Sequence, residues 1–374
     1  MERGEIKDAA PPPPPTKPQQ RDLEQASRIF EAWIRRRVPG AEDAVILNAH
    51  APTGAGVANE TILVEAEQTV DGRRQPRGYV IRVDTSEHLF MGMDLQVHYR
   101  MYETLNSEPA VPTPRVLGFE ADRSLIGERF FVMERVEGRV PPDRPHYADT
   151  GWVTELTLPQ REKMWRDIVT MMARMHALPR EKFAFLERPD MGRTGLEQLL
   201  NHWLAYAKWC GGDRYDVVRR GGAWLADHLP GDIPTGLSWG DARAQNVMFR
   251  DGEIVAVFDW DMVSLAGAET DLAWWITAQQ GTRQLAGFGN GGQTVELWES
   301  LSGRSARHMD WHMAFMAFQL TVIMIRLPTL LHRQGLIDDA GLAAYVTHPG
   351  ARLASLLDLP WEGPPLPPPA RWDE

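Results

Sequence analysis

Cysteine is almost absent from this sequence of 374 residues. Its single cysteine, Cys210, can form neither an internal disulfide nor a paired-cysteine metal knuckle, so a disulfide-stapled scaffold and structural zinc are both excluded. Basic charge is also in deficit, because 40 Lys and Arg stand against 51 Asp and Glu, for a net charge of −11. Without the positive surface that phosphate backbones require, nucleic acid is not an expected partner.

Long hydrophobic runs are missing as well. The first thirty residues hold charged and proline-rich sequence in place of an apolar leader. The longest apolar run, residues 313–325, is interrupted by Gln319 and ends at Arg326. It is shorter than the roughly 20 residues that a membrane span needs. We therefore expect a cytoplasmic protein with no membrane partner.

Proline is concentrated at the two ends of the chain, in residues 11–15 and 364–369. Because proline removes backbone donors and favours an extended conformation, the ends are not expected to pack. The predicted organisation has four parts, namely a proline-rich tail over 1–24, a first lobe over 25–133, a second lobe over 134–360 and a proline-rich tail over 361–374.

The two central parts differ in their hydrophobic patterns, which predicts an α+β fold. The first is rich in strand-like runs separated by turn residues, with one helix between them. The second carries apolar residues at helical spacing, interrupted by one strand pair. The predicted strands are 60–70, 78–84, 115–120, 129–133 and the pair within 247–259, and the predicted helices are 94–105, 160–178, 194–209, 271–276 and 312–331.

The strand pair in the helical part is predicted to be a tight hairpin. Two apolar runs flank the Asp-Gly dipeptide at 251–252, which favours a two-residue turn. That turn would place Arg250 opposite Glu253. Counting outward along both strands places Asn246 opposite Val257.

This register would bring oxygen-bearing side chains together. Asp259 becomes the diagonal neighbour of Asn246 on the same face of the hairpin, about 7–8 Å away at the backbone. An amide oxygen and a carboxylate at that separation can converge on Mg²⁺, which binds oxygen ligands and leaves positions open for phosphate. Asp241 lies five residues before Asn246, on the loop that enters the hairpin.

The spacing of these three residues is typical of phosphoryl transfer. An aspartate, an asparagine five residues later and a second aspartate 13 residues after that form the arrangement that kinases use. The triphosphate needs a metal to draw charge from its oxygens, and the acceptor hydroxyl needs a carboxylate to orient it and take its proton. Any one of these side chains alone would more often be a turn or cap residue, so the joint spacing carries the prediction.

The block resembles the aminoglycoside phosphotransferase family, within the choline-kinase-like and protein-kinase-like folds. The matching segments are Gly240-Asp241 with Asn246, residues 258–261 and residues 271–273. The resemblance implies a small antiparallel-sheet lobe and a larger, mainly helical lobe, with the nucleotide between them. It also implies that Asp241 is the catalytic base, that Asn246 and Asp259 bind Mg²⁺, and that Asp271 is a buried anchor for the catalytic loop.

A glycine-containing loop precedes the first long predicted strand. Gly54, Gly56 and Asn59 lie between strand-like segments, where missing side chains would let backbone amides approach nucleotide phosphates. The stretch lacks the third glycine and the following helix of a dinucleotide-binding turn. A plain hairpin loop is the alternative.

The kinase pattern next requires a cation on a strand, but no lysine occurs between Lys17 and Lys163. Arg82 is therefore the candidate, because a guanidinium can bind phosphate oxygens through two parallel hydrogen bonds. Family members usually supply a helix glutamate to hold this cation. His98 stands nearest that place and Glu103 follows further along, so no ion pair is assigned.

The segment after residue 130 resembles the hinge that binds the nucleotide base through its backbone, with Glu134 and Val136 as the contacting residues. An ordinary connector between the two parts is compatible with this. Gly138 would permit a turn there. Trp239 stands where many relatives carry histidine, and a buried indole there could brace the catalytic loop by packing.

The sequence thus predicts a phosphotransferase that moves the γ-phosphoryl of ATP or GTP, with Mg²⁺, to a hydroxyl of a small molecule. The acceptor is left open between an aminoglycoside, a macrolide and a hydroxyacyl-CoA, since net charge reports the whole surface and not one pocket. A catalytically silent nucleotide-binding pseudokinase is the alternative from another class.

Overall fold

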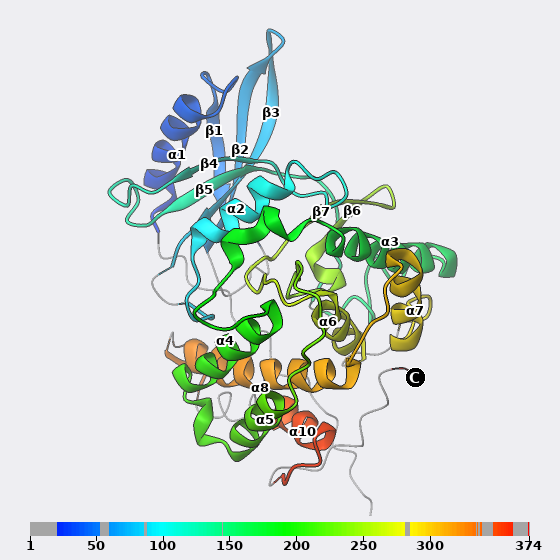
Figure 1. The fold of residues 1–374 in the computed structure, drawn as a ribbon. Helices are drawn as coiled ribbons and strands as arrows, with labels where there is room; N and C mark the ends of the chain where they lie inside the picture. Colours follow the sequence, from blue (N-terminus) through cyan, green and yellow to red (C-terminus); the bar gives the residue numbers. More distant parts are fainter. Residues whose placement is uncertain are drawn as a thin grey trace, which may run out of the picture.

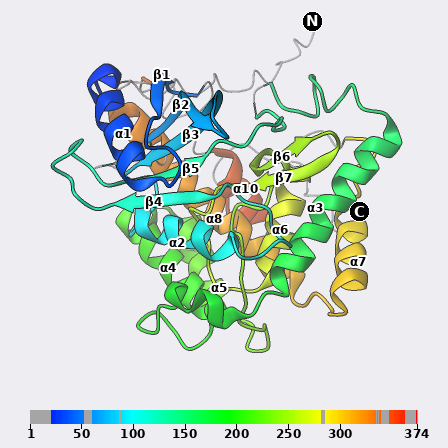
Figure 2. The same cartoon turned by 90° about the horizontal axis from the view of Figure 1, so that it is seen from above.

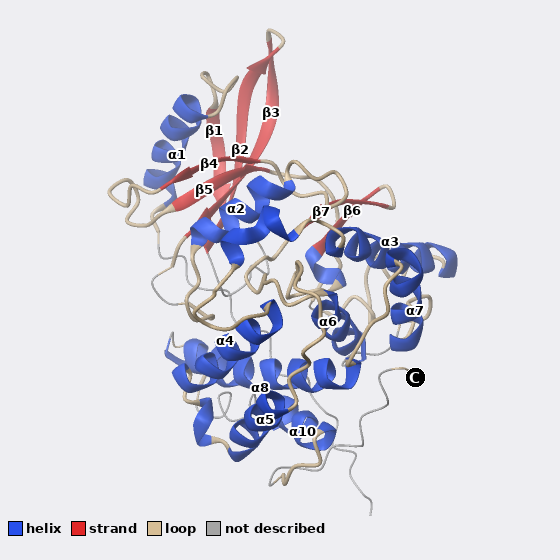
Figure 3. Ribbon diagram, viewed as in Figure 1, coloured by secondary structure: helices blue, strands red, loops and turns tan. Residues whose placement is uncertain are grey.

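A computed structural model describes residues 21–52, 60–85, 88–143, 145–280, 285–333, 335, 337–338, 347–361 and 373. Gly54, Gly56 and Asn59, the predicted phosphate-covering loop, lie outside these residues. The described chain has a sheet-rich lobe and a larger helical lobe (Figures 1 and 3). The predicted α+β fold, with a small antiparallel-sheet lobe and a larger, mainly helical lobe, is confirmed.

The first lobe is built on a five-stranded antiparallel sheet with strand order β1-β2-β3-β5-β4. Two helices accompany it. Its elements are α1 (Leu23–Arg37), β1 (Val45–His50), β2 (Glu60–Val70), β3 (Arg73–Val83), α2 (Leu95–Leu105), β4 (Val116–Glu120) and β5 (Phe130–Glu134).

Both faces of the sheet carry apolar side chains, because successive residues of a strand point to opposite faces. On β5, Phe130 and Val132 belong to the cluster that α1 completes, whereas Phe131 and Met133 belong to the cluster that contains α2 and the second lobe. The sheet therefore separates α1 from α2, as Figure 2 also shows from above. β5 thereby joins the cores of the two lobes.

The second lobe is mainly helical. Its helices and strands are α3 (Leu158–His176), α4 (Gly195–Trp209), α5 (Asp216–Asp227), β6 (Val247–Arg250), β7 (Glu253–Val257), α6 (Ala268–Gln280), α7 (Gly291–Ser302), α8 (Met309–Arg333) and α10 (Thr347–Leu356). Short 3-10 turns are η1 (Arg180–Leu186), η2 (Gly212–Arg214) and η3 (Ala244–Asn246).

Helix α8 is longer than the apolar run that it contains. Among the described helices it alone is long and apolar enough to cross a membrane by length and composition, because the helix continues well beyond the apolar run at 313–325. However, 72% of its most apolar window is buried inside the protein, as in the core helix of a globular lobe. It packs against α6, α5 and α10.

The β6–β7 hairpin turns as predicted but pairs differently. Asp251 and Gly252 both have positive φ, +53° and +80°, and Arg250 faces Glu253. A bulge between Met248 and Phe249 then shifts the register, so Val257 faces Val247 and the predicted pairing of Asn246 with Val257 is wrong. The physical reason is one extra residue on β7, which the turn cannot specify.

Candidate active site

Asn246 ends the η3 turn at the entrance of the hairpin, directly beside Asp241. Its Nδ2 donates to the Asp241 carboxylate at 2.8 Å and to the Asp241 backbone oxygen at 3.0 Å. The Phe258 amide donates to the Asn246 backbone oxygen at 2.9 Å, which ties η3 to the segment that leads into Asp259. The predicted base and one predicted metal ligand are thus in direct contact.

The amide of Asn246 is oriented by these bonds. Because both of its N–H groups are used on Asp241, its Oδ1 points elsewhere and accepts no hydrogen bond from any residue in the described part of the chain. An amide oxygen held in this way fits a hard cation, which prefers oxygen ligands.

The Asp241 carboxylate is held on both oxygens. Its Oδ1 accepts a 2.7 Å hydrogen bond from the indole of Trp274, and its Oδ2 accepts from Arg243 Nε at 2.9 Å as well as from Asn246. Arg243 also donates to Asp143 at 3.0 Å. Asp241 is 9% exposed, so it is largely shielded from solvent.

Asp259 lies beyond β7 in the left-handed region, with φ of +62°. Burial, together with the charges of Asp261 and Asp241, raises the pKa of Asp259 to about 7. Burial and the charge of Asp241 likewise raise the pKa of Asp261 to about 6, against the opposing charge of Arg82. Three carboxylates therefore act on one another across a small space.

This donor set fits Mg²⁺. A divalent cation would relieve the repulsion that raises both pKa values, and Asn246 Oδ1 and Asp259 can supply neutral and anionic oxygens. In the described ranges no group of three or more His, Cys, Asp or Glu side chains is arranged to hold a metal. The remaining ligands would therefore come from water and phosphate, as Mg²⁺ commonly has them in phosphoryl transfer.

The catalytic loop is anchored by Asp271, which is fully buried near the start of α6. Its Oδ1 accepts from the Ser238 hydroxyl at 2.9 Å and the Gly240 amide at 2.8 Å. Its Oδ2 accepts from the Trp239 amide at 2.7 Å and lies 2.8 Å from His176 Nε2. Four donors on one carboxylate fix the backbone immediately before Asp241.

His176 has both ring nitrogens in use. The Trp298 indole donates to its Nδ1 at 3.0 Å, so the hydrogen lies on Nε2 and is donated to Asp271. The sequence indicates a satisfied histidine on a packed helix, and the structure shows in addition that this residue supports the anchor.

Trp239 braces the segment that carries Asp259. Its indole Nε1 donates to the backbone oxygens of Phe258 at 2.7 Å and Asp259 at 3.1 Å, and the side chain is fully buried. The sequence predicts that Trp239 braces the catalytic loop by packing, and the structure shows that its indole also donates hydrogen bonds.

Glycine is required at position 240, next to Trp239. The φ of Gly240 is +93°, and a β-carbon there would come within 2.2 Å of the Met262 backbone oxygen. The loop before Asp241 and the segment after Asp259 therefore press directly against each other.

Arg82 lies on β3 and donates to the Thr61 hydroxyl at 2.6 Å. Its charge acts on Asp259, Asp261 and His98, so the predicted cation faces the acidic cluster.

On α2, His98 occupies the place of the missing acid, with its Nδ1 3.1 Å from Asp261 Oδ1. Burial, reinforced by Arg82, lowers the pKa of His98 to about 4, so the contact is a hydrogen bond from a neutral ring. Glu103 instead accepts from the Tyr99 hydroxyl at 3.1 Å.

The predicted hinge follows β5. The Glu134 carboxylate pairs with Arg115 at 2.6 Å, and the Val136 amide donates to no residue in the described part of the chain. An unused amide at this position is available to a nucleotide base.

Glycine is needed at position 138 for close packing, and not for the turn that the sequence predicts. Its φ is not positive, and a β-carbon there would meet Met248 Cγ at 2.5 Å and the Phe249 oxygen at 2.8 Å. It allows the connector to lie against β6, where the Arg139 amide donates to the Phe249 oxygen.

Several functional contacts had no local signal in the sequence. No motif around Trp274 marks it as functional, and its bond to Asp241 depends on where α6 packs. The Arg243 and His98 contacts join residues of different elements. Among these contacts, only that of Arg243 has a signal in the sequence, because Arg243 lies two residues after Asp241.

Comparison with known families agrees with this geometry. The sequence model described as "Phosphotransferase enzyme family" (APH) matches residues 51–304. The chain belongs to this family and carries its phosphotransferase domain, as the segment around Asp241 indicates. The family resemblance and the predicted class of enzyme, a kinase with an alcohol group as acceptor, are confirmed by this match.

Curated relatives are larger proteins. Acyl-CoA dehydrogenase family member 11 of Pongo abelii is 26% identical over 258 residues, which cover 66% of this chain and 30% of the relative. Probable acyl-CoA dehydrogenase IBR3 of Arabidopsis thaliana is 24% identical over 235 residues, 59% of this chain and 27% of the relative. The chain thus aligns with only about 30% of the length of such relatives.

Solved structures share the fold. A Ralstonia eutropha protein provisionally described as an aminoglycoside phosphotransferase superposes with a TM-score of 0.65 at 21% identity, covering 90% of this chain and 96% of that one. The gentamicin complex of APH(2")-IIa has a TM-score of 0.52 at 12% identity, covering 86% and 95%. The ADP and hygromycin B complex of an APH(4)-Ia mutant has a TM-score of 0.51 at 17% identity, covering 84% and 98%.

Proposed function

We propose that this protein transfers the γ-phosphoryl group of ATP or GTP, with Mg²⁺, to a hydroxyl of a small molecule. The observation that carries the proposal is the contact of Asp241 with Asn246 on a loop that Asp271 holds in place, near the half-buried Asp259, whose pKa the charge of Asp241 raises. Nucleotide-bound neighbours of the same fold support a nucleoside triphosphate as co-substrate.

The reaction follows from these positions. Asp241 orients the acceptor hydroxyl and takes its proton as the oxygen attacks the γ-phosphorus, while the bond to the β–γ bridging oxygen breaks and the nucleoside diphosphate leaves. Asn246 and Asp259 would hold Mg²⁺, which would supply charge neutralisation at the phosphate oxygens. Positioning and charge neutralisation supply most of the catalysis in such a transfer.

The nucleotide would lie between the proposed lobes, residues 25–133 and 134–360. Arg82 would bind phosphate oxygens, and the backbone at Glu134 and Val136 would bind the base. The phosphate-covering role of Gly54, Gly56 and Asn59 and the cytoplasmic location stay predictions.

A pseudokinase is the second candidate. It is favoured by His98 in the place of the helix acid, since Arg82 forms no ion pair with an acidic side chain in the described part of the chain. Such a protein would bind the Mg²⁺–nucleotide without transferring phosphate.

One experiment separates the two. ADP or GDP release is measured with ATP and GTP over a panel of hydroxyl-bearing metabolites and antibiotics, for wild type, Asp259→Ala and the surface control Asp216→Ala. We expect release with wild type and the control but not with Asp259→Ala. Wild-type turnover in Asp259→Ala would refute the metal assignment, and thermal stabilisation by Mg²⁺–nucleotide without any release would favour the pseudokinase.

A further inference from the structure

A pocket lies beside the reaction centre, between three segments that are far apart in the sequence. Residues 90–98 before and within α2, residues 185–203 of η1 and α4, and residues 260–265 after Asp259 line it. The centres of water-sized molecules can occupy about 110 Å³ of it, so it has room for a group of several heavy atoms.

The pocket adjoins the catalytic loop. Met262 lines it, and the Met262 backbone oxygen is the atom that excludes a β-carbon at Gly240, the residue before Asp241. Ser264 also lines it and exchanges backbone hydrogen bonds of 2.9 and 3.0 Å with Ser238 on the loop. Part of the pocket wall therefore packs directly against the loop that carries the proposed base.

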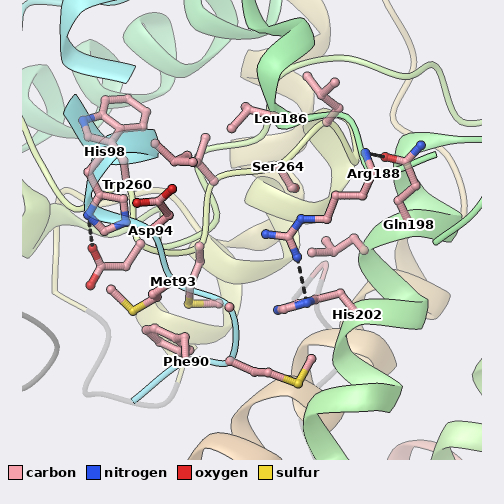
Figure 4. Close-up of a pocket in the computed structure, with 18 of the residues that line it drawn as sticks. Phe90, Met93, Asp94, His98, Leu186, Arg188, Gln198, His202, Trp260 and Ser264 are labelled. Atoms are coloured by element: carbon pink, nitrogen blue, oxygen red, sulfur yellow. Dashed lines mark hydrogen bonds and ion pairs between the residues drawn. The ribbon is translucent and has the colours of Figure 1, made fainter. Parts of the chain in front are cut away.

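The two sides of the pocket carry different charges (Figure 4). Asp94 and His98 lie on one side, and Arg188 and His202 on the other. The acids already have partners, because Asp94 pairs with Arg129 at 2.9 Å and Asp261 with His98 at 3.1 Å.

Arg188 has no such partner. Its Nη1 lies 2.8 Å from His202 Nδ1, and among the described residues the charge of Asp190 acts on its guanidinium from beyond ion-pair distance. Arg188 is exposed, so a ligand can reach it. Gln198 holds the Arg188 backbone by accepting from its amide at 2.9 Å.

His202 adds a donor but no charge. Burial, with the charge of Arg188 beside it, lowers the pKa of His202 to about 4, so the ring is neutral at physiological pH. With Nδ1 accepting from Arg188, the hydrogen lies on Nε2, which meets no acceptor in the described part of the chain. Arg188 and His202 together present guanidinium and imidazole N–H groups and no acceptor.

The remaining wall of the pocket is largely apolar. Its members are aromatic, aliphatic and thioether side chains, which suit a hydrocarbon body: Phe90, Met91, Leu186, Leu199, Trp203 and Met262.

We infer that this pocket binds the acceptor, and that the acceptor joins an anionic oxygen group, a carboxylate or a phosphate, to an apolar body. Arg188 and His202 bind the anion, the apolar wall holds the body, and the hydroxyl faces the catalytic loop. A guanidinium fork matches such oxygens. A polycationic acceptor would instead bring ammonium groups against an unpaired arginine, which disfavours it. The inference rests on the proposed function, of which it names the substrate class.

Binding can be tested apart from chemistry. Calorimetric titration in the presence of Mg²⁺–ADP would compare octanoate, octyl phosphate and neutral octanamide as probes. The proteins are wild type, Arg188→Gln and Arg180→Gln, whose arginine is an exposed residue at the start of η1, outside the pocket. Kanamycin serves as the polycationic probe.

We expect at least one anionic probe to bind wild type and Arg180→Gln about tenfold more tightly than octanamide, and Arg188→Gln to lose that preference while binding octanamide unchanged. Which of the two anions binds more tightly identifies the head group. Equal affinity for octanamide and both anions, or tighter kanamycin binding in wild type than any anion, would overturn the inference.

Failure of the proposed function gives a different result. If the protein is a pseudokinase, the anion preference persists, while no compound of the hydroxyl-bearing panel causes release of ADP from Mg²⁺–ATP. If the protein is a kinase of cationic acceptors, ADP release occurs with kanamycin and the anion preference is absent. The folded state of Arg188→Gln is checked by its unchanged melting temperature and its unchanged octanamide affinity.

Discussion

The catalytic loop and the pocket beside it are held in opposite ways. The loop is rigid, because Asp271 accepts four hydrogen bonds and the three hydrogen bonds to the Asp241 carboxylate come from three different residues. The pocket's cation, Arg188, is exposed and contacts only neutral groups. The comparison suggests that the chemistry depends on a fixed geometry that tolerates little change, whereas acceptor choice depends on a few side chains that can be exchanged separately.

The largest effect is expected at the reacting carboxylate. Asp241→Asn removes the proton acceptor while keeping the shape of the side chain, so kcat should fall by roughly 100- to 10,000-fold. Mg²⁺–nucleotide affinity should stay within a few-fold of wild type, measured by calorimetry. A kcat near the wild-type value would remove Asp241 from the reaction.

The next effect concerns the anchor. Asp271→Asn leaves at least one of four buried donors without an acceptor, which should lower the free energy of unfolding by about 2–4 kcal/mol and reduce kcat as well. Urea denaturation gives the first quantity. Asp216→Asn, at an exposed carboxylate at the start of α5, should change the free energy of unfolding by no more than about 0.5 kcal/mol. Equal losses in both variants would contradict the special role of Asp271.

A smaller effect is expected at Trp239, where the hydrogen bond of the indole can be separated from the packing of its ring. Trp239→Phe removes the indole N–H that reaches Phe258 and Asp259, and should cost about 1–2 kcal/mol of stability and several-fold in kcat. Trp311→Phe removes a similar buried indole bond, to the Leu225 oxygen at 3.2 Å, away from the site.

The Trp311 variant should lose stability without losing kcat. If both variants lose kcat equally, the Trp239 hydrogen bond has no specific function. Trp239→His, which restores an N–H donor, should recover part of the kcat lost in the phenylalanine variant.

The smallest effect belongs to the pocket. His202→Phe removes a neutral donor beside Arg188 and should weaken octanoate binding by about threefold, with kcat and the melting temperature nearly unchanged. Calorimetry and steady-state kinetics measure the two quantities. A tenfold fall in kcat at unchanged octanoate affinity would show that the pocket and the loop are not separable in this way.

The sequence predicted those parts of the site that depend on local spacing. Asp271 holds the loop before Asp241, as the resemblance implies, because a short loop and the start of one helix carry these residues, and the predicted Asp251-Gly252 turn forms with positive φ at both positions. Strand β2 begins and ends at the predicted residues, since period-two burial and a turn define it.

The remainder depends on packing between distant segments. The β7 bulge changes the hairpin register without any change in the turn. The pocket is formed by residues 90–98, 185–203 and 260–265, whose proximity no single segment specifies. Trp274 reaches Asp241 only because α6 packs beneath the loop.

The most direct test of the central claim is an electron paramagnetic resonance titration with Mn²⁺ in place of Mg²⁺, in the presence of a non-hydrolysable ATP or GTP analogue. The account predicts bound Mn²⁺ in wild type and in Asp216→Ala, and weak binding in both Asn246→Ala and Asp259→Ala. Undiminished Mn²⁺ binding in both of the latter variants would contradict it.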